Sequence, residues 1–143
     1  MTLRRVILHA SVWLCVFALW LVATRQFHPT WTIAVCATAV LVAASALAVY
    51  LNALVLRPRF ARQRLRYAVS LFATIVLLDL LAVLSIGAVY DRLWRPDPLR
   101  FGFWFNLASD GFIIVLHLLA ATAVVWLARG KTKDAPHREL TRS

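Results

Sequence analysis

The sequence predicts an all-α membrane protein, built as an antiparallel bundle of four transmembrane helices. Of its 143 residues, 62% are hydrophobic and 15% are charged, whereas about a quarter of the residues in a soluble domain carry charge. The chain contains four apolar runs, each near the length of about 20 helical residues that crosses a hydrocarbon core of about 30 Å. None of the runs alternates strictly between polar and apolar residues, so the pattern of β-barrel strands is absent.

The four expected spans cover residues 6–24, 31–56, 67–90 and 103–128, and residues 129–143 form a polar cytoplasmic tail. The first span is expected to be a retained anchor, because its apolar run is long for a signal peptide and Leu21 stands where a cleavage site needs a small residue. Pro58 is expected to end the second span, because proline restricts the residue before it. The links are short, so consecutive helices should pack as antiparallel neighbours.

The distribution of basic residues predicts that both termini are cytoplasmic. Twelve Lys and Arg residues fall on the side of the two termini and the segment 57–66, and four fall on the other side. Cytoplasmic loops collect such residues, which explains the net charge of +10 without a nucleic-acid partner. Short loops and the arginine bias indicate a bacterial inner membrane. The aromatic residues expected near the outer interface are Trp20, Trp31, Tyr90, Trp94 and Trp104.

Polar residues within the spans are the candidates for function, because ionisable groups in the membrane interior are costly and usually have a role. They are Asp79, Asp110, His117 and Asn106. Asp79 and His117 lie about 18 Å and 16 Å from the inner ends of their spans at the helical rise, so a hydrogen bond between them is allowed if they face each other. Asn106, Asp110 and His117 lie within about 40° on one helix face. This stripe could sense a ligand or relay protons, or it could simply hold helices together.

Five arginines, Arg57, Arg59, Arg62, Arg64 and Arg66, follow the second span. If the segment is helical, Arg59, Arg62 and Arg66 share one face. Such a segment anchors topology, and it can also bind anionic lipid or a cytoplasmic partner. Span two contains the small-residue pairs Ala39/Ala43 and Ala44/Ala48, which permit close approach within the chain or in a homodimer.

The stretch Tyr50-Leu-Asn52-Ala-Leu-Val-Leu56-Arg-Pro58, followed by basic residues and Tyr67, resembles the membrane input region of LytS/AlgZ-type sensor histidine kinases. The similarity covers about eighteen residues and the layout of the spans. It implies a multi-span input region that feeds a cytoplasmic kinase core. No kinase motif follows the last span, and His137 lacks the context of a phospho-acceptor. The resemblance therefore implies at most a membrane input or regulatory module.

The expected function is accordingly a non-enzymatic sensory or regulatory membrane module. No nucleophile elbow, zincin motif, P-loop or dinucleotide fingerprint occurs in the sequence. Cys15 and Cys36 have no metal-site spacing and are expected to be packing residues. We therefore expect no catalytic residue, metal or cofactor. Two alternatives stay open: an accessory subunit of a larger membrane complex, and a small proton-coupled transporter or channel.

Overall fold

The computed structural model describes residues 3–60, 62–94 and 102–133, apart from the side chains of Arg5 and of residues 127–133. The elements, in order, are α1 (Leu3–Thr24), η1 (Arg25–Phe27), α2 (Trp31–Leu51), η2 (Asn52–Leu56), α3 (Arg57–Phe60), α4 (Arg64–Leu93) and α5 (Phe103–Lys133). All of them are helical, so the all-α prediction is confirmed. Four stretches are long and apolar enough to cross a membrane, namely Val6–Phe27, Trp31–Phe60, Arg64–Leu93 and Phe103–Trp126.

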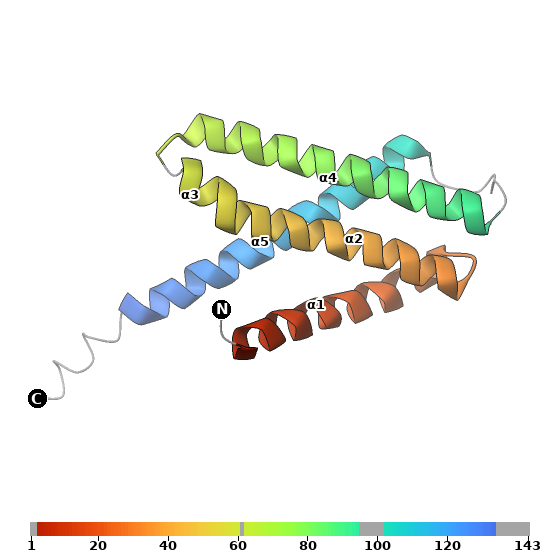
Figure 1. The fold of residues 1–143 in the computed structure, drawn as a ribbon, viewed down its shortest axis with the longest axis horizontal. Helices are drawn as coiled ribbons and strands as arrows, with labels where there is room; N and C mark the ends of the chain where they lie inside the picture. Colours follow the sequence, from red (N-terminus) through yellow and green to blue (C-terminus); the bar gives the residue numbers. More distant parts are fainter. Residues whose placement is uncertain (1–2, 61, 95–101, 134–143) are drawn as a thin grey trace, which may run out of the picture.

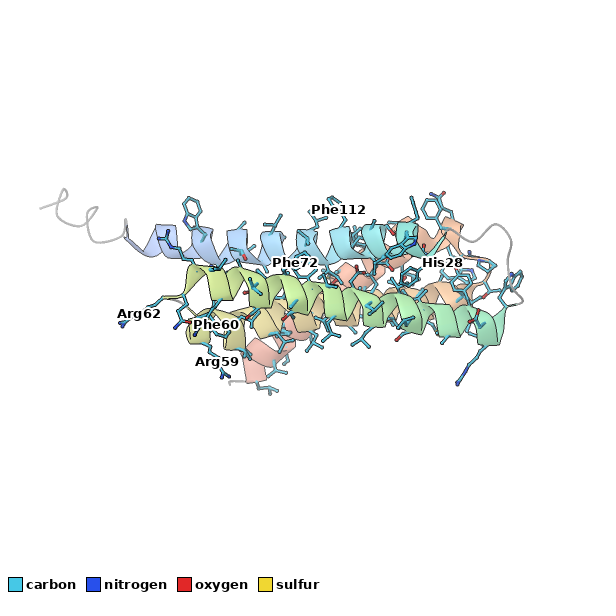
Figure 2. All side chains as sticks on the ribbon, turned by 90° about the horizontal axis from the view of Figure 1, so that it is seen from above. His28, Arg59, Phe60, Arg62, Phe72 and Phe112 are labelled. Atoms are coloured by element: carbon cyan, nitrogen blue, oxygen red, sulfur yellow. The ribbon has the colours of Figure 1, made fainter. Side chains whose placement is uncertain are left out.

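Successive long helices run in opposite directions along the molecule (Figure 1). In the view of Figure 1, α2 lies between α1 below it and α4 above it, and α5 crosses behind α2 and α4. Helix α2 is the central element, because it contacts α1, α4 and α5. We call the end with residues 57–66 the basic end, and the end with residues 25–30 the aromatic end. Figure 2 shows His28 at the opposite end of the bundle from Arg59 and Arg62.

The helix starts at the aromatic end follow from local sequence. Thr30 has an extended backbone and its hydroxyl accepts a hydrogen bond from the Ile33 amide, so it caps the start of α2. The carbonyl of Gly102 accepts from the amides of Phe105 and Asn106 at the start of α5. Helix α5 continues to Lys133, past the expected end at residue 128. Residues 95–101 of the link between α4 and α5, and residues 134–143 of the tail, lie outside the described residues.

The expectation that Pro58 ends the second span is wrong, because the helix continues through it to Phe60. Proline lacks an amide and its ring collides with the carbonyl four residues earlier in a regular α-helix. Here the preceding residues Asn52–Leu56 form a π turn, and the amide of Arg57 bonds to the carbonyl of Asn52. A π turn carries one more residue per hydrogen-bonded ring. The altered bonding pattern accommodates the proline inside a continuous helix.

The arginine segment is not one helix, so its expected shared face does not form. Arg57 and Arg59 lie on α3, whereas Arg64 and Arg66 begin α4 three residues earlier than the expected start at 67. Arg62 lies in the turn between them. The hydroxyl of Tyr67 donates to Asn52 Oδ1 at 2.8 Å. This bond ties the first turns of α4 to the π turn.

The apolar core lies where α2, α4 and α5 meet. Its central cluster consists of Ala48, Leu78, Ile114 and Leu118. Small residues let the helices approach closely, and of the two alanine pairs in α2, Ala44 and Ala48 face this cluster, while Ala39 and Ala43 are exposed. The pair Ala44/Ala48 therefore serves contacts within the chain.

Candidate functional site: a cavity at the aromatic end

A cavity of about 370 Å³ lies between the helices at the aromatic end. All four long helices line it, together with the link between α1 and α2. Its apolar wall includes Trp20 of α1, Phe27 of the link, Leu41 of α2 and both Phe105 and Ile113 of α5. This size is at the lower end of the range for small-molecule sites, which are concave and mostly apolar with a few polar groups.

One polar group in the wall stands without a partner. Thr38 of α2 lines the cavity, its side chain is 3% exposed, and no described atom forms a hydrogen bond with its Oγ1. A buried hydroxyl that lacks a hydrogen bond is destabilising by about 1–3 kcal/mol. Such groups are uncommon in folded proteins, and each needs an explanation. A bound molecule that completes the hydrogen bond is one.

Helix α5 supplies three more polar groups of the wall. Asn106, Ser109 and Asp110 line the cavity in the first turns of this helix. The Ser109 hydroxyl donates to the Asn106 carbonyl at 3.1 Å and retains lone pairs that can accept. Asp110 is half-buried and is the acidic side chain of the wall. Two of the four polar candidates from the sequence, Asn106 and Asp110, thus belong to the cavity.

A histidine and a tyrosine line the cavity at the aromatic end. His28 Nδ1 and the Tyr90 hydroxyl lie 2.6 Å apart, which joins the α1–α2 link to the last turns of α4. Both residues line the cavity. Burial, and then the nearby guanidinium of Arg25, lower the pKa of His28 below its usual value of 6.5. The imidazole is therefore neutral at pH 7.

Asp79 lies deeper, next to the cavity rather than in its wall. It is buried on α4, and its carboxylate packs so closely against Gly111 that a Cβ at that glycine would stand 2.7 Å from Oδ2. The other oxygen, Oδ1, is buried without a hydrogen-bond partner among the described residues. Asp79 is also within electrostatic range of Asp110. The two carboxyl groups are neighbours across the α4–α5 contact.

The hydrogen bond that the sequence allows between Asp79 and His117 is not formed. His117 Nδ1 bonds to the Ile113 carbonyl at 2.8 Å, and its Nε2 accepts from Trp20 Nε1 at 3.1 Å. These two partners assign the proton to Nδ1 and leave the ring neutral. Asp79 instead packs against Gly111, which lies six residues, or about 9 Å of helical rise, from His117 on α5. His117 faces α1, whereas Asp79 faces α5 at Gly111.

A second polar contact holds α1 towards the basic end. The Tyr50 hydroxyl accepts from Trp13 Nε1 at 3.1 Å and lies 3.0 Å from His9 Nδ1. The Trp13 ring also lies 6.1 Å from the ring of His117. Trp13 and Trp20 are seven residues apart, which places them on the same face of α1. Helix α1 is thus attached by indole N–H donors at two levels.

The five arginines at the basic end do not join the cavity. Their side chains are all exposed. Arg66 donates to the Gln63 side chain at 2.9 Å, and the Arg59 guanidinium lies 5.9 Å from the Phe60 ring centre. Across the described residues, no three His, Cys, Asp or Glu side chains come together as a metal site would require. Cys15 and Cys36 are both free.

Searches with protein-family models, among curated proteins and among solved structures find no match to this chain. The site must therefore be interpreted from its own chemistry.

Sequence reasoning missed Thr38, His28, Tyr90 and the cavity role of Trp20. Trp and Tyr are common at membrane interfaces, so the sequence alone assigns Trp20 and Tyr90 to the interface. That assignment gives no indication of their bonds to His117 and His28. A usable signal was present for Thr38, because Thr38 and Ser45 are seven residues apart on one face of an otherwise apolar helix. Both hydroxyls are buried and unpartnered.

Proposed function

We propose that the protein is a non-enzymatic membrane sensory module that binds a small molecule in the cavity at the aromatic end. The observation that carries the proposal is the composition of the cavity wall: side chains from all four long helices meet there, with the unpartnered hydroxyl of Thr38 among them. A ligand in this position would contact every long helix at once. Its binding would therefore bias how these helices pack.

Trp20 provides the route from the cavity to the rest of the bundle. It lines the cavity and also donates to His117 on α5. A ligand that displaces the indole changes the contact between α1 and α5, and α1 then moves relative to its attachment at Tyr50. The output is the position of α1 at the basic end. A sensor of this kind needs two helix arrangements with different affinities for the ligand.

The proposal includes an orientation. With the termini and the arginines in the cytoplasm of a bacterial cell, the cavity opens towards the outer half of the inner membrane. The support is the excess of basic residues at the basic end. The ligand would then arrive from outside, and α1, α3 and α4 would present the response to cytoplasmic partners.

Binding can be tested in lipid nanodiscs with three probes of similar size: 2-phenylethylammonium, 2-phenylethanol and phenylacetate. We expect at least one of them to raise the melting temperature, since a ligand that binds only the folded state stabilises it by about 2.7 kcal/mol at 100 times its Kd. Ser109→Leu should abolish the shift by filling the cavity. Ala108→Leu, at the exposed neighbouring position, adds the same side chain outside the cavity and should preserve it.

Sensing is tested by the distance between spin labels at Leu3→Cys and Gln63→Cys, in a background with both native cysteines changed to Ala. Both positions are exposed at the basic end. The probe that stabilises the protein should change this distance, and Ser109→Leu should prevent the change. If no probe binds, or if Ser109→Leu binds as well as the native chain, the cavity proposal is wrong. Binding with an unchanged distance would contradict sensing.

A second candidate function, a small proton-coupled transporter, is favoured by one observation. Asp79 Oδ1 is buried without a partner in the described structure and is next to Asp110, and intramembrane carboxyl groups often relay protons. Proton flux into liposomes that Asp79→Asn abolishes would favour this function. Flux equal to that of empty liposomes would leave the sensory module as the better account.

A further inference from the structure

We infer that the cavity selects an organic ammonium ion, with its charged head at Asp110 and Thr38 and its apolar body against the aromatic wall. The inference rests on the proposed function, because it names the class of ligand for the same site. Four features lead to it: the charge of the wall, its hydrogen-bond acceptors, its aromatic faces and the placement of Arg25 outside it.

The charge of the wall is negative. Asp110 lines the cavity, and the described lining residues include neither lysine nor arginine. Asp79 adds a second carboxyl group within electrostatic range of the first. His28 contributes no opposing charge, because burial and Arg25 lower its pKa. A positive ligand gains from this field, and its gain is large where water is excluded.

The acceptors of the wall match an ammonium head. An alkylammonium group has three N–H donors and no acceptor. The carboxylate of Asp110 accepts, and the Oγ1 of Thr38 is a buried atom without a partner in the described structure. The Ser109 hydroxyl donates to the Asn106 carbonyl in this structure, and its lone pairs can accept from a ligand. A carboxylate ligand would instead be placed beside the carboxylate of Asp110 and would be repelled by it.

The apolar part of the wall suits a flat or short hydrocarbon body. Trp20, Phe27, Tyr90 and Phe105 come from four different segments and surround the space. Aromatic faces attract a cation within about 6 Å of the ring centre, most strongly where water is displaced. The cavity of about 370 Å³ accommodates a single aryl or short alkyl group with its amine.

Arg25, in the link between α1 and α2, does not line the cavity, and its guanidinium is engaged elsewhere. Its Nη1 donates to the His28 carbonyl at 2.7 Å, and its carbon Cζ lies 4.7 Å from the Trp31 ring centre. Trp31 is exposed and does not line the cavity. The guanidinium of Arg25 therefore lies outside the wall, and the carboxyl group of Asp110 lies within it.

The test compares the affinities of 2-phenylethylammonium, 2-phenylethanol and phenylacetate for the full chain in nanodiscs of zwitterionic lipid, by isothermal titration at pH 7. We expect the ammonium ion to bind roughly tenfold or more tightly than the alcohol, because bonds to charged partners are stronger than neutral ones. Phenylacetate should bind weakest. Asp110→Asn should remove the preference for the ammonium ion, while the alcohol keeps its affinity.

Asp91→Asn is the matched control, because Asp91 is an exposed carboxyl at the end of α4 outside this cavity. It should leave the preference intact. Thr38→Val is a second, independent variant that removes the hydroxyl at constant size, and it should weaken the ammonium ion several-fold. Equal affinities for the three probes, or tighter binding of phenylacetate, would overturn the ammonium inference and leave the binding site standing. If none of the three probes binds, both proposals fail.

Discussion

Where α2, α4 and α5 meet in the middle of the bundle, they enclose the apolar cluster of Ala48, Leu78, Ile114 and Leu118. Towards the aromatic end the same three helices, joined by α1, surround a cavity with a carboxyl group and an unpartnered hydroxyl in its wall. The first region is packed by side chains that fill the space. In the second region the side chains leave an open space, and polar atoms line it. The contrast indicates that the first region maintains the fold and the second is available for binding.

The largest expected effect is on the apolar cluster. Leu118→Ala removes a side chain that is 6% exposed, and its loss leaves a void, so the free energy of unfolding should fall by about 2–5 kcal/mol. Leu119→Ala is the adjacent control. Leu119 is 62% exposed, so this substitution should lower the free energy of unfolding far less. Reversible unfolding in mixed micelles with increasing SDS measures both. Equal losses would show that the cluster is not the packed core.

A smaller effect is expected where the two regions join. Gly111→Ala places a Cβ 2.7 Å from Asp79 Oδ2, so one helix must shift, at about 1–3 kcal/mol. Combining it with Asp79→Ala removes the obstacle. The double variant should therefore lose less than the two single losses added together, as a double-mutant cycle from the same unfolding titration can measure. Strict additivity would contradict the close contact.

The bond between Trp20 and His117 is expected to contribute less again. Trp20→Phe retains an aromatic ring in the cavity wall but removes the indole N–H, and such interhelical bonds contribute about 0.6 kcal/mol on average. Trp104→Phe is the control, because Trp104 is 77% exposed. In the His117→Leu background the indole has no acceptor at this position, so Trp20→Phe should lose its bond-specific effect. An unchanged effect in that background would exclude the bond as its source.

The smallest effect concerns pH. The unfolded chain protonates His28 near its usual pKa of 6.5, whereas the folded chain does so only at lower pH. Acidification therefore favours the unfolded state, and stability should fall as pH drops from about 7 through the lowered pKa. His28→Gln should flatten this part of the curve. Parallel melting-temperature curves for the two proteins between about pH 7.5 and 5.5 would contradict the assignment.

The sequence was sufficient for the helices, because run length and hydropathy are properties of each segment alone. The end of α1 at Thr24 and the start of α2 at Trp31 agree with the limits of the expected spans, whereas α1 begins at Leu3, before the expected start at residue 6. The rotation of each helix about its axis was not available, because it depends on packing between segments. Asp79 and His117 illustrate this limit: the helical rise predicted similar depths, but Asp79 packs against Gly111 on α5 and His117 accepts a hydrogen bond from Trp20 on α1. The bond between Trp20 and His117 joins residues that are far apart in the sequence, so no local pattern predicts it.

The π turn at Asn52–Leu56 separates one long helix into two parts with different phase. Each residue of an α-helix advances by about 100° around the axis, so a surplus residue offsets everything beyond it. A helical wheel continued from α2 assigns Arg57 and Arg59 to a wrong side of the helix. The direction of the arginines at the basic end therefore cannot be read from the face that α2 turns to its neighbours.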